Sequence, residues 1–384
     1  MADGELLLRR KKQRWFIFVF FFLSGIISAS LSSRLPDIQQ MLKVNNSVFG
    51  MVLSSLYAGL FIGLTFASWL VASYGSKKVM IITCVLSGLS LVFAGMFSSY
   101  VLAMLVLFLM GISRTIFNLS ANTGAIEVQS LYDRPIIAGF HGVWSMACFV
   151  AGGIGQLMIS YTVSPFFHFL FIAAFVCFAI GFLKNKKQGL SIEKERRPFF
   201  VKPDRYLFLL GLMALCTMLC EGAMFDWSVN YFEKVVHAKR NLLTAGYLSF
   251  VIAMALGRLV GDKLIAEFGM FRLLFMNGIL LAIGFSIAAT FPMVLPAAMG
   301  FLLIGLGDSV MVPVIYLLAT RSPKMTAAYS LSIVTFIGYT GFLIGPLLIG
   351  NISQYFGLPT AFYCLSGISL LIIVLSLQVK KVVP

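Results

Sequence analysis

Twelve stretches of this sequence are strongly apolar, almost free of charge and long enough to cross a membrane as helices, which takes about 20 residues. They are residues 15–33, 47–72, 78–97, 101–126, 136–160, 165–183, 206–227, 242–266, 272–291, 294–319, 326–349 and 358–379. With 60% hydrophobic and 11% charged residues, the 384-residue chain is too apolar for a soluble domain. We therefore predict an all-α integral membrane protein with 12 transmembrane helices.

The basic residues fall mainly on alternate predicted loops. They precede the first stretch at 9–14, follow the sixth within 184–205, and close the chain at Lys380 and Lys381. Because cytoplasmic loops are enriched in Lys and Arg, we predict a multi-pass protein of the inner (cytoplasmic) membrane with both termini in the cytoplasm. This distribution accounts for the net charge of +15, so we expect no nucleic-acid partner.

The chain is predicted to consist of two similar halves. The segment "KNKKQGLSIEKERRPFFVKPDR", residues 184–205, is the one long polar stretch, and it separates six predicted helices in 1–183 from six in 206–384. "LVASYGSK" from Leu70 aligns with "LIAEFGMFR" from Leu264, and the same offset aligns Arg114 with Asp308. Duplicated halves are common among membrane transport folds. We predict two pseudo-symmetric six-helix bundles joined by a cytoplasmic basic linker.

Arg114 and Asp308 are ionisable residues inside apolar stretches. A charge at the bilayer centre costs roughly 2.5–3.5 kcal/mol even on insertion scales, so each should face a partner or a wet cavity. Their opposite signs and equivalent positions suggest that they pair with each other when no solute is bound.

Polar residues beside these charges define a candidate solute site. Asn118 and Asn122 follow Arg114 at helical spacing, which places the three on one helix face. The predicted substrate-binding set is Arg114, Asn118, Asn122, Asp308, Tyr316, Ser28 and Thr217. The alternative is that the neutral polar groups only join helices, as Ser, Thr and Asn often do in membranes.

Other ionisable residues are candidates for proton coupling or gating, namely Glu221, Asp226, Glu127, Arg134 and His141. Glu221 is predicted in the outer part of its helix, where it carries a proton or makes an interhelix hydrogen bond. Asp226 precedes Trp227, a residue type that favours the membrane interface, so an anchoring role is the alternative there. Glu127, Arg134 and His141 flank one turn and form either an inner gate or a structural salt bridge with a helix-capping histidine.

Several motifs resemble a known family. They are "NLSANTGAIEVQ" with "DRPIIAGFHGVWS" (118–145), "EGAMFDWS" (221–228), "GRLVGDKLIAEFG" (257–269) and "GYTGFLIGPLLIG" (338–350). Together with the two six-helix halves, they resemble the major facilitator superfamily, and more narrowly the bacterial YbjJ-like permeases, distant relatives of fucose permeases. The chain departs from the superfamily pattern where Ala72 and Ala266 replace an aspartate, and where Gln156 follows Gly155 in place of the antiporter proline.

The resemblance implies a secondary active transporter that moves a small polar metabolite, sugar-like or anionic, by alternating access, either coupled to protons or as a uniporter. Two alternatives remain at this stage. One is a drug or metabolite exporter acting as a proton antiporter, and the other is a membrane receptor or scaffold that does not transport. No nucleophile with its base, metal cluster or nucleotide-binding loop is visible in the sequence, so we expect no enzyme activity and no cofactor. The expected partners are the solute, protons and the lipid bilayer, and the expected state is a monomer.

Overall fold

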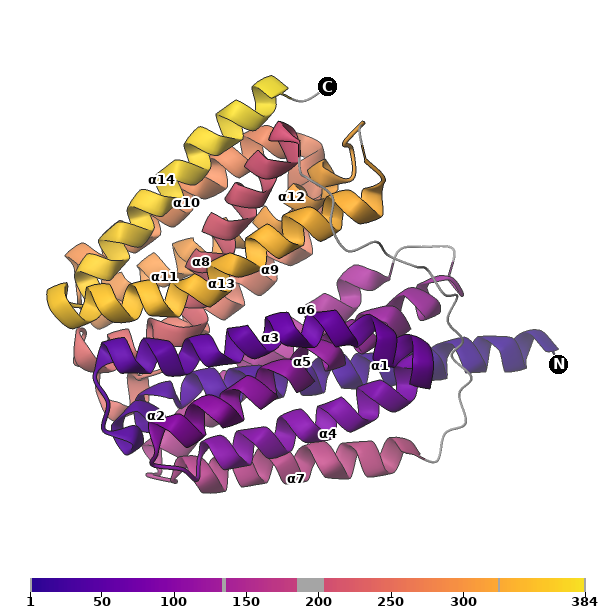
Figure 1. Ribbon diagram of the computed structural model, residues 1–384, viewed down its shortest axis with the longest axis horizontal. Coiled ribbons are helices and arrows are strands. Elements are labelled where there is room, and N and C mark those ends of the chain that lie inside the picture. Colours follow the sequence, from indigo (N-terminus) through magenta and orange to yellow (C-terminus); the bar gives the residue numbers. More distant parts are fainter. Residues whose placement is uncertain (1, 133–135, 185–203, 324, 383–384) are drawn as a thin grey trace. The chain divides into compact units, whose positions relative to one another are not determined.

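In the computed structural model, which describes residues 2–132, 136–184, 204–323 and 325–382, the described chain contains helices and turns but no strand (Figure 1). Twelve helical segments of this part are long and apolar enough to cross a membrane, which confirms the predicted number. The elements are α1 (Ala2–Ser33), α2 (Leu35–Leu42), α3 (Asn46–Tyr74), α4 (Ser76–Ala94), α5 (Tyr100–Gln129), α6 (Ile137–Ser160), α7 (Pro165–Lys184), α8 (Arg205–Lys234), η1 (Arg240–Leu242), α9 (Ala245–Phe268), α10 (Met270–Thr290), α11 (Val294–Asp308), α12 (Met311–Ala319), α13 (Ala327–Phe356) and α14 (Leu358–Val382).

The chain divides into two compact units, each described by itself below. Unit 1 comprises Met1–Lys43 and Ser55–Arg196, and unit 2 comprises Val44–Ser54 and Arg197–Pro384. The first turns of α3 therefore belong with the second unit, where Ser47 Oγ donates to Asn351 Oδ1 over 2.6 Å. Most of the predicted linker 184–205 lies outside the described residues, so its role stays a prediction.

The two units repeat the same helix packing. In unit 1, α1 packs against α6, and α4 packs against α5 and α7. In unit 2, α8 packs against α13, and α10 packs against α11 and α14. These pairs occupy corresponding places in the two halves. The repeat seen in the sequence is thus a repeat of tertiary structure.

Equivalent glycines maintain this packing in both units. Gly111 on α5 lies so close to α3 that an added Cβ would meet the carbonyl oxygen of Leu56, and Gly305 on α11 stands in the same relation to Phe250 on α9. Small residues allow membrane helices to approach backbone to backbone and gain van der Waals contact. The Gly111 and Gly305 contacts therefore fix which helix faces meet.

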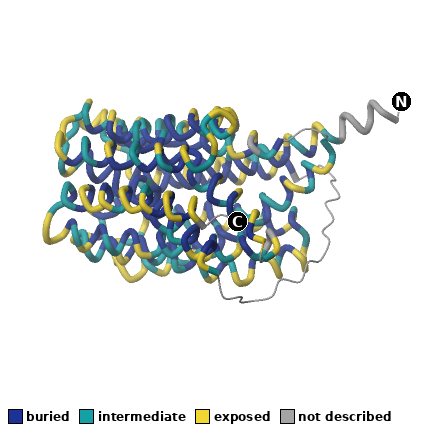
Figure 2. The backbone as a smooth tube through the Cα atoms, turned by 90° about the horizontal axis from the view of Figure 1, so that it is seen from above, coloured by how far each residue is buried: buried dark blue, intermediate teal, exposed yellow. Residues whose placement is uncertain are grey.

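Exposed residues occur along the helices of both units (Figure 2), and many of them are large and apolar. Phe178 is 75% exposed, Leu295 is 73% exposed and Phe182 is 67% exposed. A soluble domain rarely leaves large apolar patches exposed, whereas lipid tails provide an apolar solvent for them. This surface supports a multi-pass membrane protein.

Two expectations about α8 are corrected. The helix continues beyond the predicted end to Lys234, so Glu221 lies near its middle and not in an outer part. Trp227 is fully buried, with its ring centroid 5.9 Å from that of Phe49, so it does not face lipid headgroups as an interface anchor would. Asp226 is also buried, which removes the anchoring alternative for this pair.

Candidate functional site

A buried ion pair joins α8 to α9 in unit 2. Nη2 of Arg258 lies 3.5 Å from Oε1 of Glu221, and the two side chains are 23% and 12% exposed. A carboxylate this far from water needs a partner, and the guanidinium provides one. Glu221 therefore makes the interhelix contact that the sequence suggested as one of its two roles.

The tenth predicted span is broken into two helices next to this ion pair. α11 ends at Asp308 and α12 begins at Met311. A helix end leaves backbone carbonyls without intrahelical partners, and Nε of Arg258 donates to the Ser309 carbonyl oxygen over 3.3 Å. Gly257 contributes as well, because a Cβ there would meet Oγ of Ser309. Gly257 thus allows the junction between α11 and α12 to lie close to α9, and Arg258 donates to one of the backbone carbonyls at that junction.

Asp308 is the second carboxylate of this cluster. It is 2% exposed, and neither of its carboxylate oxygens has a hydrogen-bond partner among the described residues. Its charge interacts with those of Glu221 and Arg258. One guanidinium thus faces two carboxylates, and it is already bonded to one of them.

Two other predicted residues lie on helices of the same unit. Tyr316, on α12, interacts with Tyr339 and Thr335 of α13 and with Glu221. Thr217 is fully buried, and its hydroxyl donates to the Met213 carbonyl of its own helix over 2.9 Å. The structure therefore brings Tyr316 near Glu221, while the Thr217 hydroxyl is bonded within α8.

The polar stripe predicted in unit 1 is partly bonded between helices. Ser24 Oγ on α1 donates to Oδ1 of Asn118 on α5 over 2.9 Å, and Asn122 Nδ2 donates to the Asn118 carbonyl over 2.9 Å. Ser28 Oγ donates to the Ser24 carbonyl over 2.8 Å. These contacts fit the role of joining helices and also order a polar face on α5.

Arg114 lies one turn before Asn118 on that face. It is half-buried and makes no hydrogen bond or ion pair with any residue that the structure describes. Asp308 belongs to the other unit, so the predicted Arg114–Asp308 pair stays a prediction.

Two of the three predicted gating residues of unit 1, Glu127 and His141, lie in the described structure. Glu127 accepts a hydrogen bond from Ser76 Oγ over 3.3 Å, at the turn between α3 and α4. His141 is exposed, with its ring centroid 5.3 Å from that of Phe21 in an edge-to-face arrangement. Arg134 lies outside the described residues. Their gating role stays a prediction.

Sequence reasoning missed Arg258. The signal was available, because Arg258 is an ionisable residue inside the apolar stretch 242–266, as Arg114 is inside 101–126. Arg34, which directly follows the apolar stretch 15–33, is a buried cation. It is 2% exposed, lies 2.8 Å from Asp37 and donates to the Val163 carbonyl over 2.6 Å. Its partners make Arg34 a structural residue.

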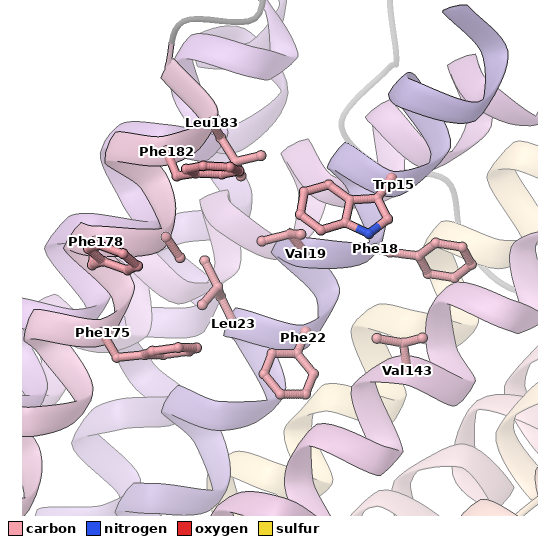
Figure 3. A pocket seen from close by; sticks show the side chains of 11 residues that line it. Trp15, Phe18, Val19, Phe22, Leu23, Val143, Phe175, Phe178, Phe182 and Leu183 are labelled. Carbon is pink, nitrogen blue, oxygen red and sulfur yellow. The ribbon is translucent and has the colours of Figure 1, made fainter. Parts of the chain in front are cut away.

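A separate hollow of about 350 Å³ lies between α1, α6 and α7 of unit 1 (Figure 3). It is lined only by apolar and aromatic side chains, namely Trp15, Phe18, Val19, Phe22, Leu23, Val143, Phe175, Phe178, Ala179, Phe182 and Leu183. A specific site for a polar solute needs polar groups that fix its orientation. This hollow is therefore not the solute site.

Comparisons with known proteins agree with this architecture. A model of the Major Facilitator Superfamily matches residues 17–338. An uncharacterized MFS-type transporter of Yersinia pestis is 27% identical over 347 residues, which cover 90% of this chain and 90% of the relative. The crystal structure of the nucleoside transporter NupG has a TM-score of 0.75 at 14% identity, with 97% of this chain and 99% of NupG covered. A variant of the E. coli fucose:proton symporter FucP has a TM-score of 0.63 at 17% identity, with 94% and 97% covered. These likenesses confirm the predicted all-α, twelve-helix fold.

Proposed function

The chain belongs to the Major Facilitator Superfamily of membrane transporters, and we propose that it moves one small polar metabolite, sugar-like or anionic, by alternating access. The observation that carries the choice of solute is Arg114, a half-buried cation within the spanning helix α5 that has no hydrogen-bond or ion-pair partner among the described residues.

A permanent guanidinium in an apolar helix is costly unless something compensates it. The cost at a helix centre is roughly 2.5–3.5 kcal/mol, and intramembrane charges usually face a wet pathway for this reason. Arginine presents a planar set of donors that matches a carboxylate or a phosphate. An anionic group of the solute is therefore the partner that fits Arg114 best.

The remaining polar residues of α5 suit a solute that also carries hydroxyl groups. Asn118 is held by Ser24, so its amide has a fixed orientation, and Asn122 lies one turn further along the same face. Amide groups both donate and accept hydrogen bonds, as sugar hydroxyls require. Arg114, Asn118 and Asn122 together favour a sugar acid or a similar hydroxylated anion.

Proton coupling is part of this proposal, and Asp308 is the proton site that the charges favour. Arg258 already bonds Glu221 and the Ser309 carbonyl, whereas Asp308 is buried and lacks any hydrogen-bond partner in the described chain. A buried carboxylate without a partner is far cheaper in its neutral form. A proton on Asp308 would make the three-residue cluster electrically neutral.

The proposal is tested first by ligand binding to the purified protein. A panel of sugars, sugar acids, nucleosides, amino acids and organic anions is screened by thermal shift on the parent, on Arg114→Gln and on Arg114→Lys. A ligand that binds only the folded form raises its apparent stability. We expect a hydroxylated anion to stabilise the parent, to lose its effect in Arg114→Gln and to keep part of it in Arg114→Lys.

Uptake into proteoliposomes separates the alternatives. A solute that stabilises the parent should be taken up, and uptake should rise when an inward proton gradient is imposed. Binding without uptake or exchange would favour the receptor or scaffold alternative, and proton-driven extrusion of cationic drugs would favour the exporter. Stabilisation that is equal in parent and Arg114→Gln would overturn the role of Arg114.

The location of the chain follows from the same reasoning. We propose the bacterial inner membrane with both termini in the cytoplasm, because the basic residues gather at the two ends of the chain and in the segment 184–205. Accessibility of cysteines introduced beside residues 9 and 381 to an impermeant thiol reagent, in intact against permeabilised cells, tests the orientation.

A further inference from the structure

We propose that unit 1 binds an anionic phospholipid of the surrounding bilayer, with one acyl chain in a groove between α3, α4 and α5 and with the headgroup phosphate at Lys78. The groove has a volume of about 640 Å³. Its lining residues are Leu70, Tyr74, Lys78, Val79, Ile82, Thr83, Leu86, Leu89, Ser90, Phe93, Val106, Leu109, Ile112, Ser113 and Ile116. Volumes of roughly 300–1,000 Å³ are typical of sites for small ligands.

The inner surface of this groove suits a hydrocarbon chain. Ile82, Leu86 and Leu109 are 48%, 48% and 51% exposed, so the groove is open along the outside of the unit. The hydroxyls of Thr83 and Ser90 donate to carbonyls of their own helix, over 2.7 Å to Val79 and 2.8 Å to Leu86. Polar groups that are already bonded have little to offer a polar solute, so the occupant we expect inside the groove is apolar.

The charge lies at one end of the groove. Lys78 is exposed, its ammonium lies 5.6 Å from the Tyr74 ring centroid, and it has no ion-pair partner among the described residues. The neighbouring Lys77 is not part of the groove, because its ammonium lies 5.4 Å from the Phe16 ring centroid on α1, and the nearby acid, Glu127, accepts a hydrogen bond from Ser76. From Lys78 to Phe93, α4 extends about 22 Å at ~1.5 Å per residue, enough for an acyl chain to lie along it. A basic group at the end of an apolar groove between transmembrane helices is complementary to an anionic lipid.

The repeat provides an internal comparison. Ser90 on α4 and Val106 on α5 correspond to Gly284 and Gly300 of unit 2, where a Cβ on either glycine would lie 2.6 Å from the carbonyl oxygen of the other. α10 and α11 thus meet backbone to backbone at this level, whereas α4 and α5 have the larger side chains of Ser90 and Val106 at these positions. Arg272 corresponds to Lys78 and is also exposed, so it is a cation at the equivalent position of the other unit.

The experiment measures lipid binding to the purified, delipidated protein by native mass spectrometry. The probes are phosphatidylglycerol and phosphatidylcholine with identical chains, and the proteins are the parent, Lys78→Gln, Ile82→Trp and Arg272→Gln. We expect the parent to prefer phosphatidylglycerol, and Lys78→Gln to reduce this preference about fivefold, equivalent to roughly 1 kcal/mol for one lysine beside an anionic lipid. Ile82→Trp, which fills the groove, should weaken binding of both lipids.

Arg272→Gln is the matched control, and it should leave the preference unchanged. An equal loss in Arg272→Gln and Lys78→Gln would mean general attraction to basic residues and would overturn the proposal, as would unaltered binding in Ile82→Trp. Melting curves in detergent without added lipid identify a variant that has not folded, and Leu86→Trp then replaces Ile82→Trp. None of these outcomes depends on which solute the protein transports.

Discussion

Arg258 on α9 and Glu221 on α8 form an ion pair in unit 2, with Nη2 and Oε1 3.5 Å apart, and Nε of the same guanidinium donates to the Ser309 carbonyl where α11 ends. One side chain therefore neutralises a buried acid and satisfies a backbone carbonyl at a helix break. This contact connects three elements of the unit: α8, α9 and the junction between α11 and α12.

Removing the charge of Arg258 alone should destabilise the protein more than removing the charges of both Arg258 and Glu221. In Arg258→Gln, Glu221 remains buried without its counter-charge, and the expected loss is about 3 kcal/mol of unfolding free energy. Adding Glu221→Gln should restore part of that loss, because the stranded charge is gone. Denaturation in detergent, followed by circular dichroism, measures both variants. If the loss of unfolding free energy in the double variant equals the sum of the losses in the two single variants, Arg258 and Glu221 do not stabilise each other.

Asp308 should carry a proton in the purified protein at neutral pH. We expect the infrared band of a protonated carboxyl group to be present in the parent and absent in Asp308→Asn. A band that persists in Asp308→Asn would place the proton elsewhere. This measurement requires no solute, so it tests the proton site independently of the substrate.

Asp308→Asn should also uncouple transport from the proton gradient. With no titratable group at position 308, accumulation driven by a pH gradient should fall to the level of vesicles without protein, while solute exchange at equal pH should continue. Glu267→Gln is the control, since Glu267 is an exposed carboxylate near the end of α9 and belongs to none of the proposed sites. Proton-driven accumulation by Asp308→Asn would contradict the assignment.

The predicted pairing of Arg114 with Asp308 has its own test. If the two charges compensate each other in the empty protein, Arg114→Gln alone should lower stability more than Arg114→Gln combined with Asp308→Asn. Melting temperatures of the parent, both single variants and the double variant complete the cycle. Additive effects would mean that the two residues are independent and that Arg114 has another partner.

Alanine at the two equivalent glycines should be harmful. An added Cβ at Gly111 or Gly305 would meet a backbone carbonyl of the facing helix, and crowding of this kind typically costs about 1–3 kcal/mol. Gly153→Ala on α6 is the matched control, because no atom lies within 4 Å of its added Cβ. There the higher helix propensity of alanine should leave stability unchanged or raise it by up to ~1 kcal/mol. Melting curves of the three variants distinguish these outcomes.

The sequence predicted the helices and the repeat because both depend on local composition. Apolar stretches must form helices in a bilayer, where backbone groups have no other partners. The repeat is also visible in the turns, since Gly75 and Gly269 correspond to each other and have φ of +83° and +74°, a region that strongly favours glycine. Both features can be read from consecutive residues.

The sequence could not predict features that depend on contacts between helices. The break in the apolar stretch 294–319 does have a sequence signal, because Pro313 has no N–H to donate to the Ser309 carbonyl, but the sequence does not show that Arg258 of another helix bonds this carbonyl. Trp227 was expected at the membrane interface from its residue type, whereas its burial depends on its neighbours, including Phe49. Site assignments based on Arg114 and Asp308 stay predictions, because sequence position does not show what compensates each charge.

The imbalance between one guanidinium and two carboxylates in unit 2 has an electrical consequence. Glu221, Arg258 and Asp308 carry one net negative charge when Asp308 is ionised and none when a proton is bound. A membrane voltage acts on net charge, with about 2.3 kcal/mol per elementary charge for each 100 mV crossed. The cell's electrical potential would thus act on the cluster after Asp308 has released its proton and not while the proton is bound. Voltage would then influence the step in which the deprotonated protein returns, while solute and proton concentrations set how often it loads.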